Sequence, residues 1–283
     1  MEVFSQKSSL IEYIDSERVN GKIIGLVPTM GALHDGHLEL IRWSARECNI
    51  TICSIYVNPT QFNNPEDLKH YPRDLEQDME KLASENCSAV FLPDNHEMYE
   101  DNLNPSTTIN FGNIETILEG THRPGHFKGV GIVVSKLFNI VNPDYTYFGQ
   151  KDIQQYAIVK QLINDLSFGI ILRCVPTIRE PDGLAMSSRN SKLSSDDRGT
   201  AVYLYKTLVN AKEKLLKDVS FATVKKESVE FLTGLPNFIL EYLEFVDTEP
   251  FRIIDRLEDG NNPALCIAAD LGGVRLIDNL LII

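Results

Sequence analysis

The sequence predicts an α/β fold: a doubly wound parallel sheet with helices on both faces, followed by a smaller C-terminal α+β domain. Three observations indicate this. A length of 283 residues suits roughly two domains. Short apolar runs alternate with helical patterns from Lys22 to Val175, which is typical of parallel sheets. Beyond Thr177 come helical patterns and then strand patterns. We therefore predict domains over residues 1–177 and 178–283.

Strands and helices alternate along the first domain. Apolar or β-branched runs predict buried strands, and apolar residues three or four positions apart predict helices. The predicted strands are Lys22–Val27, Ile50–Val57, Ala89–Leu92, Tyr145–Phe148 and Ile170–Val175, and the predicted helices are Leu38–Glu47 and Arg73–Asn86. The first helix is expected to bury Leu38, Ile41 and Ala45. The first strand, helix and second strand together have the size of a βαβ unit.

The second domain is predicted to be helical first and then β. Ser194, Ser195, Asp196 and Asp197 form a helix-start signature. The helical patterns that follow are Arg198–Leu216 and Phe221–Leu232, and the predicted strands of a small sheet are Phe238–Val246, Leu265–Ala269 and Val274–Ile277. We find no internal repeat.

Composition and charge restrict the class of protein. The chain is 43% hydrophobic and 24% charged, as in ordinary globular proteins. Its formal net charge of −13 disfavours binding to nucleic acid or to an anionic membrane, because both need a basic surface. The five cysteines form no CxxC pair, so we expect core residues in a reducing compartment. No signal-peptide pattern and no membrane-span pattern is visible, and we expect a cytoplasmic protein.

The first candidate site follows the first predicted strand and opens the first predicted helix, with the sequence PTMGALHDGH from Pro28 to His37. Ligands of open α/β sheets bind at the carboxyl ends of strands, and a helix N-terminus offers N–H groups to phosphate. Neither nucleotide-binding glycine fingerprint fits. The imidazoles of His34 and His37 can instead donate to a phosphate. An HxGH sequence by itself is more often a surface loop, but this position favours a functional role.

The second candidate site follows the predicted domain boundary, with the sequence GLAMSSRN from Gly183 to Asn190. Hydroxyls and an arginine fork in succession suit a mobile loop that holds phosphates. Gly183 is a plausible hinge. Alone, this segment would read as a polar linker.

The two sites together resemble the HIGH and KMSKS signatures of the nucleotidyltransferase superfamily. Four further blocks narrow the resemblance: YVNPTQF from Tyr56, RPGHFKGV from Arg123, FGQKDIQQ from Phe148 and IREPDG from Ile178. All six, in this order, resemble the pantoate–β-alanine ligase family, whose length also matches. The resemblance implies a Rossmann-like first domain of the HIGH type that binds ATP and pantoate, and a lid domain that carries the MSSR clamp.

The resemblance implies a two-step amide synthesis. The carboxylate of (R)-pantoate attacks the α-phosphorus of ATP, which gives a pantoyl adenylate and pyrophosphate. The amine of β-alanine then attacks the acyl carbon and releases AMP and pantothenate. Because the adenylate hydrolyses readily, the site must exclude water.

The resemblance also assigns residues to substrates. His37, His34, Lys151 and Arg189 match the catalytic positions. The positions that match ATP contacts are Met30, Gly31, His34, His37, Gly149, Gln150, Lys151, Asp152, Ile178, Met186, Ser187, Ser188 and Arg189. Gln61 and Gln155 match the glutamines that hold pantoate, and Asn58 and Phe62 match neighbouring positions for pantoate or β-alanine. Arg123 and His126 resemble a positively charged lid segment. Asp152 is also well placed as a helix N-cap.

Magnesium is implied by the chemistry of ATP, and no side-chain cluster has the spacing of a protein-built metal site. We therefore expect the metal to be carried by ATP. The family forms homodimers, so a homodimer is expected from the resemblance, and the other partners are the small molecules ATP, pantoate and β-alanine.

Three alternatives remain. One is another nucleotidyltransferase of the superfamily that moves AMP onto a phosphorylated small molecule; it would not need the two glutamines. A tRNA-binding synthetase fragment is disfavoured by the net charge. A nucleotide-binding protein without catalysis is disfavoured because His34, His37 and Lys151 are all present.

Overall fold

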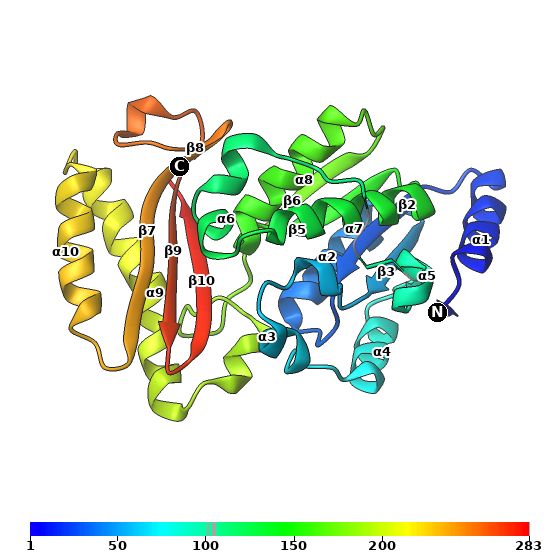
Figure 1. Cartoon of the computed structure of the whole chain (residues 1–283), viewed down its shortest axis with the longest axis horizontal. Coiled ribbons are helices and arrows are strands. Elements are labelled where there is room, and N and C mark those ends of the chain that lie inside the picture. Colours follow the sequence, from blue (N-terminus) through cyan, green and yellow to red (C-terminus); the bar gives the residue numbers. More distant parts are fainter. Residues whose placement is uncertain (101, 104–105, 283) are drawn as a thin grey trace. The chain divides into compact units, whose positions relative to one another are not determined.

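The computed structural model describes residues 1–100, 102–103 and 106–282 (Figure 1). The chain forms two units and passes from one to the other three times. The first unit comprises Met1–Gly149 and Ile158–Val175, and the second comprises Gln150–Ala157 and Pro176–Ile283. The division into two functional domains, 1–177 and 178–283, stays a prediction. The structure adds a feature that the sequence analysis did not foresee, since residues 150–157 group with the second unit.

The first unit is built on a six-stranded sheet in the order β1-β4-β3-β2-β5-β6, and every pair of neighbours is parallel. The strands are β1 (Glu2–Phe4), β2 (Ile24–Thr29), β3 (Ile50–Ile55), β4 (Ala89–Phe91), β5 (Tyr145–Gly149) and β6 (Ile171–Val175). β2 has β3 on one side and β5 on the other, so the winding direction reverses there. In such sheets the ligand crevice lies beyond the carboxyl ends of the strands at this reversal.

Helices flank the sheet of the first unit (Figure 1). They are α1 (Lys7–Val19), α2 (Asp35–Glu47), α3 (Pro65–Lys69), α4 (Leu75–Ser84), α5 (Asn95–Tyr99), α6 (Glu119–His122) and α7 (His126–Val141), with short 3₁₀ turns η1 (Pro59–Gln61) and η2 (Gly112–Thr116). α8 (Ile153–Asp165) begins in the second unit and ends in the first. On β2, Gly25 faces α2, because an added Cβ would meet Ser44, while Ile24 and Leu26 are buried on the opposite face. The α/β prediction is therefore confirmed.

One predicted core position of α2 is wrong. Ala45 is exposed, and the buried face consists of Leu38, Leu40, Ile41 and Ser44. Ser44 fits there because its hydroxyl pairs with that of Thr51 at 2.8 Å, and because Gly25 opposite has no side chain; a Cβ at Gly25 would lie 2.2 Å from Ser44 Oγ. A satisfied small polar group thus takes the place that the apolar pattern had given to its neighbour.

The second unit holds the predicted α+β arrangement. Its sheet is antiparallel in the order β10-β9-β7-β8. Its elements are η3 (Gln150–Asp152), the start of α8, η4 (Ser188–Lys192), α9 (Ser195–Leu215), α10 (Phe221–Thr233), β7 (Phe238–Thr248), β8 (Phe251–Ile253), η5 (Leu257–Asp259), β9 (Pro263–Leu271) and β10 (Val274–Leu281). Apolar residues of α9, α10 and the sheet form one core, which includes Leu208, Leu232 and Ile267. Ser194 caps α9, as the sequence predicts.

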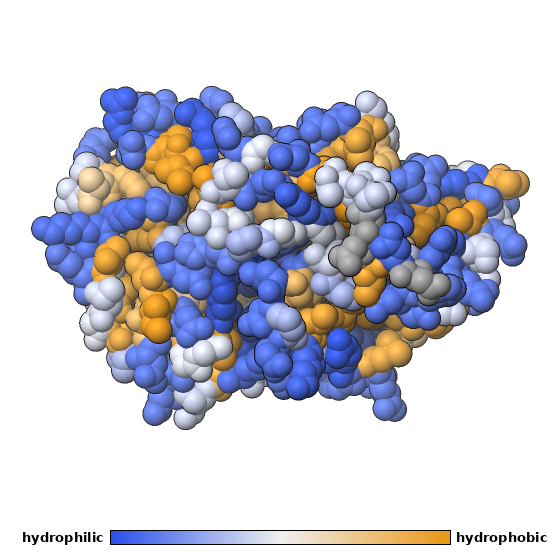
Figure 2. Space-filling model, viewed as in Figure 1, coloured by the Kyte–Doolittle hydropathy of each residue, from blue (hydrophilic) through white to orange (hydrophobic). Residues whose placement is uncertain are grey.

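The surface is mixed in polarity, and the cysteines remain thiols. Hydrophilic residues cover most of the face in Figure 2, and hydrophobic patches interrupt them. Cys174 is half-buried, the other four cysteines are buried, and all five are thiols rather than disulfides. Within the described residues, no helix combines the length and apolar character that a membrane span requires.

Candidate active site

The loop between β2 and α2 lies at the carboxyl end of the strand where the sheet reverses. Gly31 and Ala32 both have positive φ, at 79° and 51°. The carboxylate of Asp78, on α4, accepts the N–H of Ala32 at 2.8 Å and that of Leu33 at 2.6 Å. Lys81, one turn later, donates to the carbonyl oxygen of Leu33 at 2.6 Å. α4 therefore fixes the unusual backbone that leads into the two histidines.

Asp78 was missed by the sequence analysis. It is only 2% exposed, and it shares the buried face of α4 with Leu82. A carboxylate at an otherwise apolar helical position is the signal that could have indicated it, since buried charges need dedicated partners. The partners are backbone groups of a distant loop, which a sequence pattern does not identify.

His34 and His37 form the N-terminal cap of α2. The Nδ1 of His34 accepts the N–H of Gly36 at 3.2 Å, and the Nδ1 of His37 accepts the N–H of His34 at 3.4 Å. The ring centroids are 4.0 Å apart. Because both Nδ1 atoms accept, each neutral ring carries its proton on Nε2. The arrangement gives the N-terminus of α2 two imidazole donors, which suit an anionic ligand.

Asn58 and Gln61 stand at the two ends of the turn η1, after β3, and both are buried. Asn58 Nδ2 donates to Gln61 Oε1 at 3.1 Å and to the carbonyl of Gly129 at 3.3 Å, while Asn58 Oδ1 accepts the hydroxyl of Tyr99 at 2.9 Å. Gln61 Nε2 donates to Met30 Sδ at 3.0 Å. The structure thus brings Met30, Asn58 and Gln61 together, with Asn58 orienting the glutamine.

His126 and Arg123 lie at the start of α7 and reach the same turn. His126 Nδ1 donates to the carbonyl oxygen of Gln61 at 2.8 Å. Its Nε2 therefore accepts from Arg123, whose Nη1 is 3.2 Å away. Phe62, next to Gln61, is half-buried, and its ring packs edge-on against Tyr71 at 5.7 Å. The RPGHF block, which begins at Arg123, is therefore in contact with the NPTQF block, which begins at Asn58.

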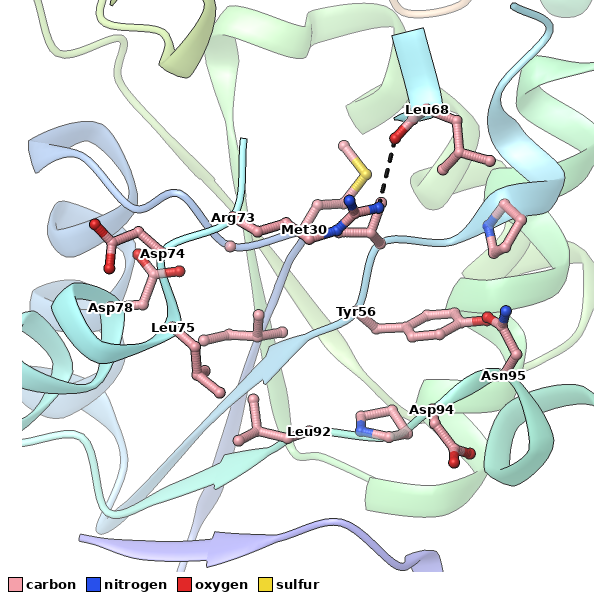
Figure 3. A pocket seen from close by; sticks show the side chains of 15 residues that line it. Met30, Tyr56, Leu68, Arg73, Asp74, Leu75, Asp78, Leu92, Asp94 and Asn95 are labelled. Carbon is pink, nitrogen blue, oxygen red and sulfur yellow. Dashed lines mark hydrogen bonds between the residues drawn. The ribbon is translucent and has the colours of Figure 1, made fainter. Parts of the chain in front are cut away.

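A cavity of about 480 Å³ lies in the first unit beside the loop between β2 and α2 (Figure 3). Met30, Gly31 and Asp78 line it, together with residues that follow β3 and β4. Arg73 extends beside Met30 and donates to the carbonyl of Leu68 at 3.4 Å (Figure 3). Most of the remaining wall is apolar, as small-molecule sites usually are.

The remaining predicted residues lie at the junction after β5 and in the second unit. Gly149 ends β5, and Gln150, Lys151 and Asp152 form the turn η3 before α8. Gln155 follows in the first turn of α8 and is half-buried, as is Lys151, whereas Asp152 is exposed. The backbone N–H of Met186 donates to the carbonyl of Ile178 at 3.0 Å, which brings those two positions together.

The MSSR segment begins a 3₁₀ turn. The hydroxyl of Ser187 accepts the N–H of Arg189 at 3.3 Å and caps η4. The preceding segment is a hairpin closed by a bridge between Arg179 and Ala185. Gly183 has a φ of 98°, and an added Cβ would lie 2.5 Å from the ring of Tyr205. This packing accounts for a glycine at the position that the sequence analysis interprets as a hinge.

The chain is similar to proteins of one known family along nearly its whole length. The sequence matches the profile described as pantoate-beta-alanine ligase over residues 2–281. The chain belongs to this family. A relative from Cytophaga hutchinsonii, named pantothenate synthetase, is 44% identical over 96% of this chain and 95% of its own length. A second pantothenate synthetase, from Porphyromonas gingivalis, is 43% identical over 99% of both chains.

Solved structures agree with the family. The pantothenate synthetase of Thermus thermophilus has a TM-score of 0.92 and 37% identity, over 100% of this chain and 99% of that one. The pantoate-beta-alanine ligase of Francisella tularensis, complexed with beta-gamma ATP and beta-alanine, has a TM-score of 0.82 and 34% identity, over 99% of this chain and 97% of that one. The predicted family resemblance is confirmed.

Proposed function

We propose that this chain condenses pantoate with β-alanine at the expense of ATP, through a pantoyl adenylate, and releases AMP and pyrophosphate. The observation that carries the proposal is the match to the ligase family across residues 2–281. The geometry supports it, because the two imidazole donors cap α2 where the parallel sheet reverses.

In the first step, the protein has to bring two anions together. His34 and His37 offer Nε2 donors to the phosphates of ATP, and negative charge that develops at the α-phosphorus is stabilised there. Lys151, Ser187, Ser188 and Arg189 are assigned to the same ATP molecule, with Met30, Gly31, Gly149, Gln150, Asp152, Ile178 and Met186 as further contacts. Most of the rate gain then comes from positioning and charge neutralisation.

Pantoate needs a binding site that leaves its carboxylate nucleophilic. Gln61 and Gln155 are assigned to this substrate, because neutral amides donate and accept without neutralising the carboxylate as an arginine fork would. Asn58, whose amide bonds to Gln61, orients that glutamine. Phe62 supplies apolar surface for the hydrocarbon part of pantoate.

The second step joins the amine of β-alanine to the acyl carbon, and AMP leaves. Arg123 is a cation linked through His126 to the carbonyl oxygen of Gln61, which supports a role for its charge in attracting the carboxylate of β-alanine. The balance is one amide bond formed and one acyl–phosphate bond broken, with one proton lost by the amine.

Magnesium, oligomeric state and compartment belong to the proposal as well. Mg²⁺ would enter on the phosphates of ATP, since phosphate oxygens and water are its usual ligands. Within the described ranges, no group of three His, Cys, Asp or Glu side chains is arranged to hold a metal ion. We also propose a cytoplasmic homodimer.

The first experiment is pyrophosphate–ATP exchange with purified protein and Mg²⁺, without β-alanine. Exchange that requires pantoate would establish a reversible adenylate step, and added β-alanine should then give AMP and the amide. Substrate consumption without exchange would indicate a different order of steps. AMP found in the final product would instead support a nucleotidyltransferase that adenylates a phosphorylated small molecule.

A further inference from the structure

The last strand of the second unit carries two neighbouring polar residues that the proposed reaction does not use. Asp278 and Asn279 lie near the end of β10 and are 3% and 1% exposed. β10 is an edge strand of its sheet. Because successive side chains of a strand point to opposite faces, neighbouring residues can contact different segments of the chain.

Asn279 contacts the turn that holds Lys151. Its Nδ2 donates to the carbonyl oxygens of Gln150 and Lys151, both at 2.8 Å, and its Oδ1 accepts from Gln150 Nε2 at 3.2 Å. The two hydrogens of the amide therefore satisfy two consecutive carbonyls. The backbone at Lys151 is fixed to β10 rather than only to the helix that follows.

Asp278 contacts the hairpin that precedes the MSSR segment. Its Oδ2 accepts from Arg179 Nη1 at 2.6 Å and its Oδ1 from Arg179 Nη2 at 2.9 Å. Burial raises the pKa of the Asp278 carboxyl, and the charge of Arg179 offsets part of that effect. The pair is a bidentate ion pair between a buried carboxylate and a half-buried guanidinium, and two parallel hydrogen bonds make such a pair geometrically specific.

Arg179 links Asp278 to the hairpin between Arg179 and Ala185. It donates to the carbonyls of Gly183, at 3.1 Å, and Asn279, at 3.2 Å, and its guanidinium lies 3.8 Å from the ring centroid of Tyr205. The hairpin between Arg179 and Ala185 leads directly into Met186–Arg189. Asn279 therefore contacts the Lys151 turn directly, and Asp278 contacts, through Arg179, the hairpin that leads into Met186–Arg189.

We propose that Asp278 and Asn279 are positioning residues that hold the Lys151 turn and the Ser187–Arg189 segment as one preorganised phosphate-binding assembly. Neither residue contacts substrate. They act by fixing the backbone of residues that do, which reduces the ordering that ATP binding must impose. The inference rests on the proposed function for the ATP roles of those segments.

The test is a double-mutant cycle on the purified full chain, with the KM for ATP in pantoate-dependent pyrophosphate exchange as the readout. Asn279→Ala is expected to raise that KM by about tenfold, since two consecutive carbonyls lose their donors, and to leave the KM for pantoate within about twofold. In a Lys151→Ala background, Asn279→Ala should have much less effect, because it acts through that lysine.

Leu276→Ala is the matched control, because Leu276 is buried on the same strand but belongs to the apolar core. It is expected to lower thermal stability and leave the KM for ATP unchanged. Asp278→Asn is the second arm, should Asn279→Ala fail to fold, and a similar rise in that KM is expected. An unchanged KM in a folded variant, or effects of Lys151→Ala and Asn279→Ala that simply multiply, would contradict the inference. Absence of both exchange and substrate consumption in the unmodified protein would contradict the proposed function instead.

Discussion

At the residue scale, His37 is the most direct test of the assigned chemistry. His37→Ala removes an Nε2 donor and one acceptor of the α2 cap, and His37 is a half-buried residue of the first turn of α2 that lies outside the apolar core. We expect a loss of exchange activity of at least about a hundredfold, with a decrease of about 1 kcal/mol in the free energy of unfolding. His96→Ala, at an exposed position on α5, is the control. Full turnover in His37→Ala would show that the catalytic assignment is wrong.

Asp78 tests whether loop geometry matters beyond the histidines. Asp78→Asn leaves one acceptor oxygen for two N–H groups and places an amide donor against one of them. We expect the free energy of unfolding to fall by about 1–3 kcal/mol and the KM for ATP to rise. Asp74→Asn is the control, because Asp74 caps the same helix through the N–H of Gln77, a role that asparagine also performs. Urea unfolding and exchange kinetics measure both effects, and equal behaviour of the two variants would exclude this role.

At the element scale, the close approach of α7 to η1 controls Gln61. A Cβ at Gly129 would lie 2.4 Å from the carbonyl oxygen of Thr60 and 2.7 Å from the Cα of Gln61. Gly129→Ala should therefore push η1 away, destabilise the protein by about 1–3 kcal/mol and raise the KM for pantoate. Gly199→Ala, at an open site in α9, should instead stabilise it by up to about 1 kcal/mol. A neutral result at Gly129 would mean that η1 adapts without displacing the glutamine.

The elements differ in how far they could be predicted. β2 and β3 were predictable because continuous apolar or β-branched runs indicate buried strands. α2 was predictable because its apolar residues recur three or four positions apart. α7 was not, because Gly129, Val130, Gly131 and many other residues of this helix are buried, so no single apolar face marks it as helical. The candidate site was also predictable only where a local sequence pattern marks it. Its motifs were visible in sequence, whereas Asp78 and Asn279 act on the backbone of residues far away in the chain, and no local pattern reports that.

At the scale of the whole molecule, buried thiols and phenols make stability depend on alkaline pH. Burial raises the pKa of Cys87 and of Cys174 to about 11, and it also raises the pKa of Tyr56 and Tyr147. An unfolded thiol titrates near about 8.5, so the folded chain binds more protons between about pH 8.5 and 11. The stability contributed by the two thiols is complete below that range and is lost as the pH rises through it. The stability contributed by the two tyrosines is lost only above about pH 10, where an unfolded phenol begins to titrate.

Urea unfolding between pH 8 and 10.5 tests this dependence. We expect the urea midpoint to fall with pH, because the free energy of unfolding decreases by up to about 1.4 kcal/mol per pH unit for each of the two thiols. Cys174→Ala removes one of the groups and should make the slope shallower. A midpoint that is constant or rises across this range would contradict the expectation.

The path of the chain between the two units has a consequence for dissection of the gene. Because Gln150–Ala157 belongs to the second unit but is encoded inside the first, no single cut releases either unit whole. A fragment that starts at Pro176 would leave the amide of Asn279 facing water instead of two carbonyls. Domain exchange between relatives at one crossover near Pro176 would therefore transfer Ser187, Ser188 and Arg189 without Lys151, which we assign to the same ATP molecule. Expression of the two halves as separate polypeptides would separate these residues in the same way.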